Sequence, residues 1–431
     1  MTQAAPELVH WLLKLGVKFN MSGYDDVDLR NFGGQKKKRT AFAQSDTGKQ
    51  IMTAMIDAVR RKEASGMVER FSHHSFLTLR LCGNICCGCV IRDEYSQETV
   101  ELPGDAVIVA TGGMHGLFGN TTGSLSNTGE VTAELFRLGV PLANGEMIQY
   151  HPTTVKCGGK RMLISEAARG EGGRLFAMKD GKQWYFMEEK YPELGNLMPR
   201  DITAREIWKV SHESEVFLDM TEISEEIISN KLSGLADDCM TYLHKDIRKE
   251  PVSVLPGIHY FMGGILVDEQ HRTPIQNLYA AGECCAQYHG ANRLGGNSLL
   301  GALYGGRVAA KSACEQADVV DLSCATQIDF PPASQISEIK QLNKVMQETM
   351  GVVRNENTLL NGIQTVQALT GNLPLLGMAV LKSALARKES RGAHWREDYP
   401  KSNDDDYLKT TVARFDGKQI QISFVPVPER R

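Results

Sequence analysis

The sequence predicts an α/β protein with a doubly wound, Rossmann-like parallel sheet, an inserted second domain and a helical C-terminal domain. Two buried-type segments carry the first prediction, because each runs straight into a glycine turn: "DAVIVATGG" (Asp105 to Gly113) and "NLYAAGE" (Asn277 to Glu283). Parallel strands that end in glycine turns bring backbone N–H groups to one edge of a sheet, where such folds bind a cofactor. The long stretch between the two segments and the helical periodicity after residue 322 predict the other two parts.

Simple patterns predict the elements before the first glycine turn. Apolar residues recur at helical spacing from Leu8 to Leu15 and end at Gly16, and a second helix is expected over 51–61. The alternating runs Phe76 to Leu81 and Ile85 to Ile91 flank a turn that contains Gly and Asn, which tolerate positive φ. These runs therefore predict a β-hairpin.

Four cysteines crowd this hairpin, in "CGNICCGC" (Cys82 to Cys89). In a regular strand Cys87 and Cys89 share one face and Cys86 points to the other, and no histidine or second cysteine pair stands at ligand spacing. An iron–sulfur cluster usually needs four convergent thiolates. We therefore expect small buried side chains here and no bound metal.

The predicted domains follow from these landmarks. The sheet domain occupies 1–145 and resumes over 259–322, the inserted domain occupies 146–258, and the C-terminal domain occupies 323–431. Helices are expected in this last domain over 336–350 and 374–388.

Composition excludes several classes of protein. The chain has 431 residues, of which 42% are hydrophobic and 23% charged, and its net charge of −4 gives no broad basic field for nucleic acid. The basic run at 36–39 stands alone and is interpreted as a solvated loop. No apolar stretch approaches the ~20 residues of a membrane span, and Met1 to Asn20 lacks a secretory signal pattern. We expect a cytoplasmic protein whose cysteines mostly remain thiols.

Four clusters concentrate residues suited to a small anionic substrate. Arginine offers a planar fork of donors that matches a carboxylate, and histidine adds a donor that can also be neutral. Each such residue alone could be structural: His151 could cap a turn, and Arg169 could pair with Glu166 on a helix surface. Their co-occurrence favours a binding site. The clusters are "QYHPTT" (149–154), "LISEAARGEGG" (163–173), "MPRDITAREI" (198–207), and "GIHYFMGGI" with "YHGANRLGGNSLLGA" (257–302).

These clusters, in this order and together with "SRGAHWREDYP" (Ser390 to Pro400), resemble the flavoprotein subunit of fumarate reductase and succinate dehydrogenase, with L-aspartate oxidase as a sister group. The resemblance runs from about residue 6 to about residue 412. It implies an FAD-binding domain interrupted by a mobile α+β capping domain, with a dicarboxylate held between cap and flavin. It also implies interconversion of fumarate and succinate by hydride transfer at flavin N5.

The resemblance assigns roles to individual residues. Arg200 matches the family's proton donor, with Glu166 and Arg169 as its relay. Arginine is an unusual acid, but the carbon it protonates is carbanion-like and its fixed charge stabilises that anion. Ser165 stands where the family often has threonine and keeps the hydroxyl. The positions that match the substrate-binding residues are Phe32, His151, Ser165, His259 and Arg293.

The same resemblance implies the cofactor contacts. Glu130 stands where the family usually has aspartate. Relatives begin with a strand and a G-x-G-x-x-G/A turn for the FAD pyrophosphate, which this sequence lacks, so we expect a chain truncated at its N-terminus. The positions that match FAD contacts are Thr111, Gly112, Gly113, Glu130, Glu283, Ser298 and Leu299.

Three functions stay open at this point. The first is a fumarate reductase or succinate dehydrogenase flavoprotein, with an iron–sulfur electron-transfer subunit as candidate partner and no membrane span of its own, so that any membrane association would come through partner subunits. The second is L-aspartate oxidase, which carries an acidic residue after the aromatic loop where this chain has Gln35 and a basic run. The third is a catalytically incomplete fragment of the family.

Overall fold

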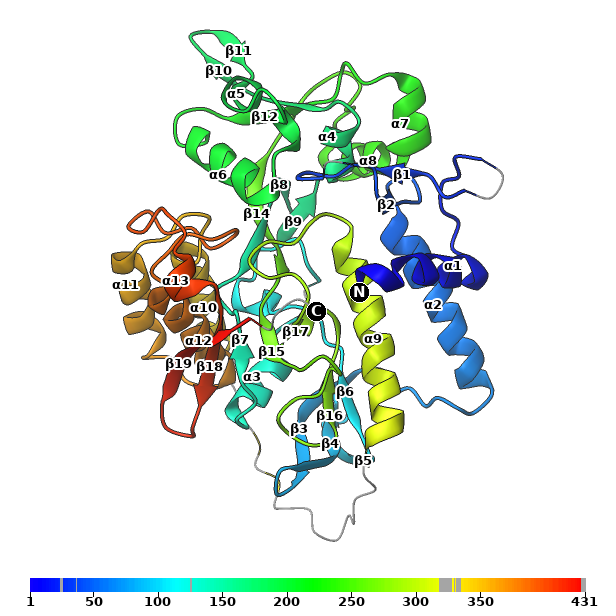
Figure 1. Ribbon diagram of the computed structural model, residues 1–431, viewed down its shortest axis with the longest axis vertical. Helices are drawn as coiled ribbons and strands as arrows, with labels where there is room; N and C mark the ends of the chain where they lie inside the picture. Colours follow the sequence, from blue (N-terminus) through cyan, green and yellow to red (C-terminus); the bar gives the residue numbers. More distant parts are fainter. Residues whose placement is uncertain are drawn as a thin grey trace. The chain divides into compact units, whose positions relative to one another are not determined.

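The computed structural model describes residues 1–23, 26–35, 37–124, 126–317, 328, 330 and 335–427. The chain divides into two compact units (Figure 1). The domain boundary expected at 322/323 and the first residue of the basic run, Lys36, lie outside the described residues. The other domain boundaries stay predictions. Unit 1 comprises Met1–Arg70, Tyr150–Ile258 and Leu294–Leu300, and unit 2 comprises Phe71–Gln149, His259–Arg293 and Gly301–Arg431.

Unit 1 begins with the two helices that the sequence predicts. Helix α1 (Ala5–Leu15) buries Leu8 and Leu12 and ends at Gly16, whose φ of 100° is easy only for glycine. Strands β1 (Leu29–Arg30) and β2 (Thr40–Ala41) pair, and α2 (Thr47–Ala64) follows. Both helix predictions are confirmed.

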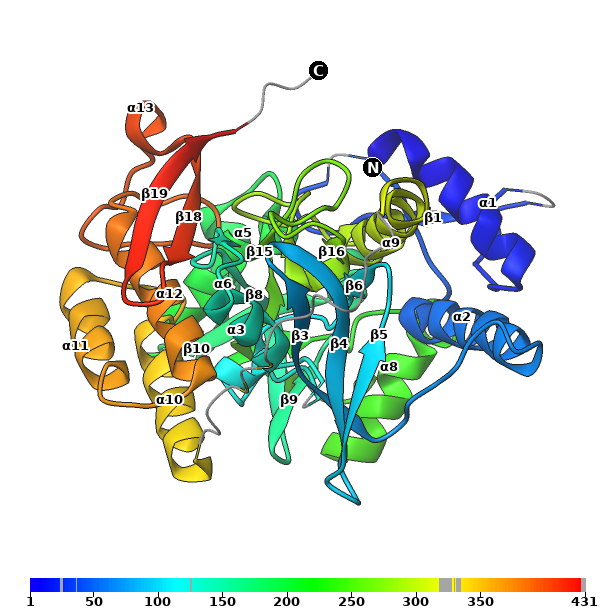
Figure 2. The ribbon, with the colours of Figure 1, turned by 90° about the horizontal axis from the view of Figure 1, so that it is seen from below.

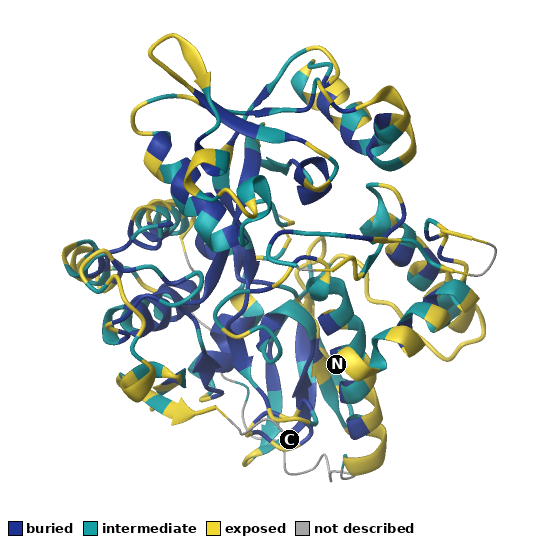
Figure 3. Ribbon diagram, turned by 45° about the horizontal axis from the view of Figure 1, so that its top comes forward, coloured by how far each residue is buried: buried dark blue, intermediate teal, exposed yellow. Residues whose placement is uncertain are grey.

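The remainder of unit 1 is built around a four-stranded antiparallel sheet in the order β11-β10-β12-β13. Its strands and the flanking helices bury one apolar cluster that includes Leu175, Leu218 and Ile207. Exposed residues gather on helix surfaces and at the tip of the β10–β11 hairpin (Figure 3). The elements are β9 (Lys160–Leu163), α4 (Glu166–Gly170), β10 (Arg174–Lys179), β11 (Lys182–Trp184), α5 (Phe186–Lys190), α6 (Arg200–Val210), β12 (Val216–Asp219), α7 (Glu225–Lys231), α8 (Ser233–Asp238) and β13 (Val252–Ser253).

Three elements contain a boundary between the units, so the chain passes from one unit to the other inside regular structure. They are β8 (Ile148–Cys157), β14 (Leu255–Phe261) and α9 (Asn297–Gln316).

The two glycine-turn segments form a parallel pair in unit 2, as the sequence predicts. Strand β6 (Val107–Val109) pairs in parallel with β16 (Leu278–Ala280), with Val109 opposite Ala280. Both strands therefore end at the same edge, and the glycine turns follow there.

The cysteine hairpin is also present in unit 2, as β3 (His74–Cys82) and β4 (Ile85–Asp93), with β5 (Thr99–Pro103) beside β4 (Figure 2). The expected alternation of its thiols is wrong. Leu79 pairs with Cys89 but Leu81 pairs with Cys86, so a β-bulge puts Cys86 and Cys89 on one face. Gly88 permits the bulge, because its φ is 135° and a Cβ would lie 2.1 Å from the carbonyl oxygen of Leu102.

Thiols Cys86, Cys87 and Cys89 are unbridged, and the first two are fully buried. Burial raises the pKa of Cys86 to about 11, so this thiol stays protonated. Among the described residues, no group of three or more His, Cys, Asp or Glu side chains is arranged to hold a metal ion.

The C-terminal part of unit 2 contains the expected helices and one hairpin that was not predicted. Strands β18 (Lys409–Phe415) and β19 (Ile420–Pro426) extend a five-stranded sheet in the order β17-β15-β7-β18-β19. Within the described ranges, no helix is long and apolar enough to span a membrane. The other elements are α3 (Glu130–Arg137), β7 (Leu142–Ala143), β15 (Gly264–Leu266), β17 (Cys285–Ala286), α10 (Ile336–Thr349), α11 (Glu356–Val366), α12 (Asn372–Ala386) and α13 (Asp404–Tyr407).

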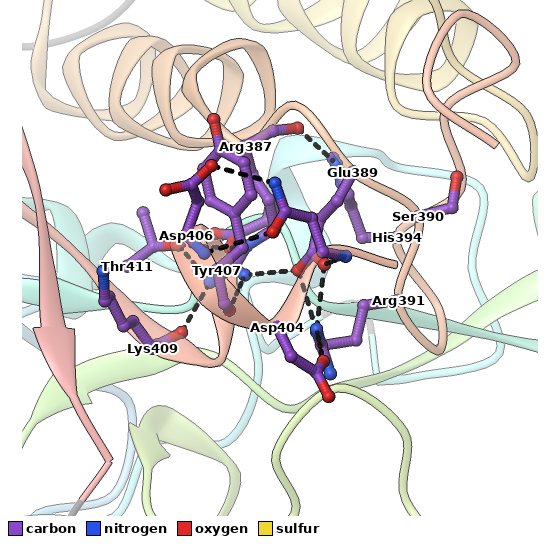
Figure 4. Close-up of polar contacts among 12 residues, drawn as sticks. Arg387, Glu389, Ser390, Arg391, His394, Asp404, Asp406, Tyr407, Lys409 and Thr411 are labelled. Carbon is purple, nitrogen blue, oxygen red and sulfur yellow. Dashed lines mark hydrogen bonds and ion pairs between the residues drawn. The ribbon is translucent and has the colours of Figure 1, made fainter. Parts of the chain in front are cut away.

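A buried ion network fastens the end of α12 to the start of β18 (Figure 4). The Arg387 guanidinium donates to Glu146 at 2.7 Å, to Glu389 at 2.8 Å and to Thr411 at 2.7 Å, and it also donates to two backbone carbonyls. Both carboxylates are fully buried and share this cation, and Glu389 also pairs with Arg391.

Replacing Arg387 by leucine is expected to lower the free energy of unfolding by about 3–5 kcal/mol, because two buried carboxylates lose their shared cation. Denaturant unfolding followed by circular dichroism measures the effect. The control is Arg414→Leu on the exposed side of β18, which should change stability by less than about 0.5 kcal/mol. Equal effects of the two substitutions would show that the network contributes nothing beyond a surface contact.

Candidate active site

One carboxylate, Glu166, organises the candidate residues of unit 1. Its Oε2 accepts from Nη2 of Arg200 at 2.7 Å and from Nε at 3.0 Å, and its Oε1 accepts from Arg169 at 3.1 Å and from the Gly33 N–H at 3.1 Å. All three charged side chains are at least nine-tenths buried. Glu166 and Arg169 lie three residues apart on α4, and Arg200 is the first residue of α6.

The charge state of this triad follows from its contacts. Burial alone would raise the pKa of Glu166, but the adjacent guanidinium groups of Arg200 and Arg169 and the Gly33 N–H outweigh it and hold the pKa at about 2. Burial and the neighbouring Arg200 charge lower the pKa of Arg169, which Glu166 partly offsets. At neutral pH, Glu166 is thus an anion between two cations.

Two glycine loops approach Glu166 closely. A Cβ at Gly33 would lie 2.6 Å from Glu166 Oε1, and a Cβ at Gly295 would lie 2.8 Å from Oε2 and 2.7 Å from the Cβ of Phe32. The side chain of Gln35 joins the loops, because it accepts from the Phe32 N–H at 3.1 Å and donates to the Gly295 carbonyl at 3.0 Å. Phe32 is therefore held beside the Glu166 triad.

The two other unit 1 candidates are His151, on β8, and Ser165, at the start of the helix that carries Glu166 and Arg169. His151 on β8 is fully buried, and its Nδ1 accepts from the Thr153 N–H at 3.2 Å. Ser165 caps α4, where its hydroxyl accepts from the Ala167 N–H at 3.3 Å. The cap fixes the start of the helix that carries Glu166.

Unit 2 contains the other two substrate candidates. His259 lies on β14, and its Nδ1 is 2.8 Å from the Thr122 hydroxyl. Arg293 is 3% exposed, and its guanidinium carbon lies 4.3 Å from the centre of the Tyr260 ring. The structure therefore groups Phe32, His151, Ser165 and Arg200 in unit 1, and His259 and Arg293 in unit 2.

The glycine turns of unit 2 form a close-packed cradle. Gly112 has a φ of 73°, and a Cβ at Gly113 would lie 2.6 Å from Oε1 of Glu283. Glu283 accepts from the Phe261 N–H at 3.0 Å and lies 3.6 Å from Nε2 of His115. Backbone N–H groups and a carboxylate at the ends of parallel strands are the groups that hold a dinucleotide, so these residues fit FAD.

For the four remaining cofactor candidates the structure gives only the exposure or the position in a helix. Thr111 is exposed, and the side chain of Glu130 is exposed at the first position of α3. Ser298 and Leu299 lie in the first turn of α9 and belong to unit 1. These four positions, like Gly112, Gly113 and Glu283, stay predictions as FAD contacts.

Sequence reasoning missed the residues that hold the candidates in place. Gln149 donates to Asn292 at 2.8 Å and to the Arg293 carbonyl at 2.7 Å. It is the first residue of the motif "QYHPTT", two residues before His151, but it was not predicted to have a role. Tyr260 likewise stands beside His259. The position of Gln149 and Tyr260 inside these motifs was the only sequence signal for their roles, because their partners lie far away in the sequence.

Two family models match the chain. The one described as FAD binding domain matches residues 1–299, and the one described as fumarate reductase flavoprotein C-term matches residues 369–430.

Individual relatives agree with these matches. A succinate dehydrogenase flavoprotein subunit of Bacillus subtilis is 35% identical, over 100% of this chain and 84% of the relative. An L-aspartate oxidase of Pyrococcus furiosus is 32% identical, over 93% of this chain and 79% of the relative. A solved structure of E. coli quinol fumarate reductase has a TM-score of 0.88 at 26% identity, covering 99% of this chain and 83% of that chain.

The Glu166 triad predicts a pH dependence of stability. The folded-state pKa of about 2 lies below the ordinary value of 4.5, so the stabilisation is complete above pH 5 and is lost as pH falls toward 2. Glu166→Gln should lower stability at pH 7 by roughly 3 kcal/mol, because two buried guanidinium groups lose their anion. Between pH 5 and 3 the variant should lose less further stability than the wild type.

The measurement is the thermal unfolding midpoint of both proteins from pH 7 to 3. Glu213→Gln, at an exposed position of the same unit, is the control and should follow the wild-type curve. Parallel curves for wild type and Glu166→Gln would contradict the assigned charge state.

Proposed function

The chain belongs to the family of succinate dehydrogenase and fumarate reductase flavoproteins, and we propose that it interconverts fumarate and succinate. Members of this family are FAD-dependent flavoenzymes, and the family model for the FAD-binding domain covers residues 1–299. The observation that carries the choice of reaction is the buried Glu166 triad, which sets two guanidinium groups around one anion beside Phe32. The glycine turns and Glu283 would hold the FAD.

The substrate assignment rests on charge. A dicarboxylate needs hydrogen-bond donors, and each unit by itself contains two candidates: His151 and Ser165 in unit 1, and His259 and Arg293 in unit 2. Arg293 is buried against an aromatic face, where water competes little for its donors. These residues would bind the carboxylates and fix which carbon faces the reacting groups.

The proton step is assigned to Arg200. FAD supplies the hydride acceptor or donor. In fumarate reduction, Arg200 would donate a proton to the carbon next to the one that gains the hydride, and Glu166 and Arg169 would pass a proton back to Arg200. The short contacts of Glu166 to both guanidinium groups support this relay, as does the lowered pKa of Arg169, which holds its protons less tightly than an exposed arginine.

Gln35 favours an unsubstituted dicarboxylate over L-aspartate. The ammonium group of aspartate calls for an acidic partner, and the Gln35 position offers a neutral amide that is already bonded to the Phe32 N–H and to Gly295. For electron exchange we propose an iron–sulfur subunit, since the Bacillus subtilis relative is itself a flavoprotein subunit.

A spectroscopic titration of the purified chain tests this proposal. Addition of FAD should give a protein-bound flavin absorption band, and fumarate, succinate or malonate should perturb it, because a dicarboxylate that exchanges a hydride with the flavin must bind within reach of it. L-aspartate is the control ligand and should perturb the band only at much higher concentration. A protein that takes up no FAD, or a band that responds to L-aspartate at lower concentration than to succinate, would overturn the proposed function.

Replacing Arg200 by alanine should abolish turnover of fumarate and succinate, by at least about 10³-fold, while FAD stays bound, because the proton donor is lost. Turnover is measured with an artificial electron donor or acceptor. Lys209→Ala, which changes an exposed cation on the same helix, is the control and should retain activity. Retained turnover in Arg200→Ala would remove Arg200 from the chemistry.

A further inference from the structure

Arg293 is held on two sides inside unit 2 by residues without an assigned role. The Tyr260 ring lies under the guanidinium group, with 4.3 Å between the guanidinium carbon and the ring centre. Gln149 donates to the carbonyl of Arg293 and to the side chain of Asn292. The position of the guanidinium therefore depends on the ring beneath it and on the path of the backbone at 291–293.

The motif "SRGAHWREDYP" fixes that path. The N–H of Ala393 donates to the carbonyl of Ala291 at 2.9 Å. Gly392 has a φ of 55°, and a Cβ there would lie 2.5 Å from the Ala291 carbonyl oxygen and 3.0 Å from the Ala291 Cβ. The two alanines also pack against one apolar cluster, formed by Met147, Tyr260 and Met262. The glycine thus allows a backbone contact that any side chain would push apart.

Several hydrogen bonds hold the turn that presents Gly392. Arg391 and His394 exchange backbone hydrogen bonds of 2.8 and 3.1 Å, and the Arg391 side chain donates to Glu389 at 2.8 Å. Glu389 in turn belongs to the buried network around Arg387 (Figure 4).

His394 adds a second anchor for the turn. Its ring lies 3.2 Å from the carbonyl oxygen of Arg387 through Nε2 and 3.0 Å from a guanidinium nitrogen of Arg354 through Nδ1. Burial, together with the Arg354 charge, holds the pKa of His394 well below its ordinary value. The ring is therefore neutral, with Nε2 as donor and Nδ1 as acceptor.

We propose that Gly392 and Tyr260 are positioning residues for Arg293: the turn at 390–394 sets the backbone that precedes Arg293, and the Tyr260 ring sets the orientation of its guanidinium. This inference rests on the proposed function, in which Arg293 binds a substrate carboxylate. Neither residue needs to touch the substrate. Displacement of a carboxylate-binding group weakens substrate binding more than it slows the chemical step, since the proton donor Arg200 belongs to another part of the chain.

The first test compares Gly392→Ala with Gly83→Ala. Gly83 has a matching φ of 58° in the same unit, and nothing lies within 4 Å of its added Cβ, so both variants carry the same backbone strain. Malonate binding by calorimetry and the KM for fumarate should weaken about tenfold or more in Gly392→Ala and less than about twofold in Gly83→Ala, with kcat changed less than KM. A merely structural defect would lower kcat per mole of protein and leave KM unchanged.

The second test separates the ring from the hydroxyl of Tyr260. Tyr260→Phe keeps the aromatic face and should bind malonate as the wild type does, whereas Tyr260→Leu removes the face and should weaken binding about tenfold. The two Tyr260 variants test the positioning role of the ring even if Gly392→Ala fails to fold. Equal binding by Tyr260→Leu and Tyr260→Phe, or by Gly392→Ala and Gly83→Ala, would overturn the positioning roles alone. A wild type that binds no dicarboxylate would overturn the proposed function, and this inference with it.

Discussion

Carboxylates and carbonyls stabilise a buried guanidinium group, and each unit of the chain contains a buried network built on that interaction. In unit 1, Glu166 stands between Arg169 and Arg200 and also accepts from the Gly33 N–H. In unit 2, Arg387 stands between Glu146 and Glu389. The two networks differ in layout. In the first, one anion is shared by two cations, whereas in the second, Arg387 is shared by two anions, of which Glu389 also pairs with Arg391.

This difference matches the two roles that we propose: catalysis for the Glu166 triad and structural support for the Arg387 network. In unit 1 two cations stand against one anion, and this excess of positive charge would favour the anionic substrate that we propose for the triad. In unit 2, the Arg387 side chain donates to two carboxylates, a hydroxyl and two carbonyls within the network. Arg387 therefore has no N–H donor left for a ligand. The effect of the network is to fix the backbone around it, including the turn that reaches Ala291.

Local patterns in the sequence predicted the elements whose causes are local. Gly16 ends α1, the Gly-Asn turn joins β3 to β4, and the two glycine-turn segments pair in parallel. The prediction that Cys87 and Cys89 share one face of the strand was wrong. A bulge at Gly88 changes the pairing with the neighbouring strand, and the sequence of one strand alone does not reveal such a bulge. The β18–β19 hairpin was missed although its signal is local: the Asp416-Gly417 turn is followed by the alternating apolar residues Ile420, Ile422 and Phe424.

The site shows the same division between what is local and what is not. Resemblance supplied the residues with recognisable chemistry, whereas Gln149, Tyr260 and Gly392 act through partners that only the fold brings near. Ala291 and Ala393 are separated by about a hundred residues, and their contact is between backbones, so side-chain type carries almost no trace of it. A glycine is the one residue type that can record such a contact, because it is required wherever a Cβ would meet a neighbouring carbonyl. For that reason the glycines of the quoted motifs, more than their charged residues, indicate which distant segments of this chain lie together.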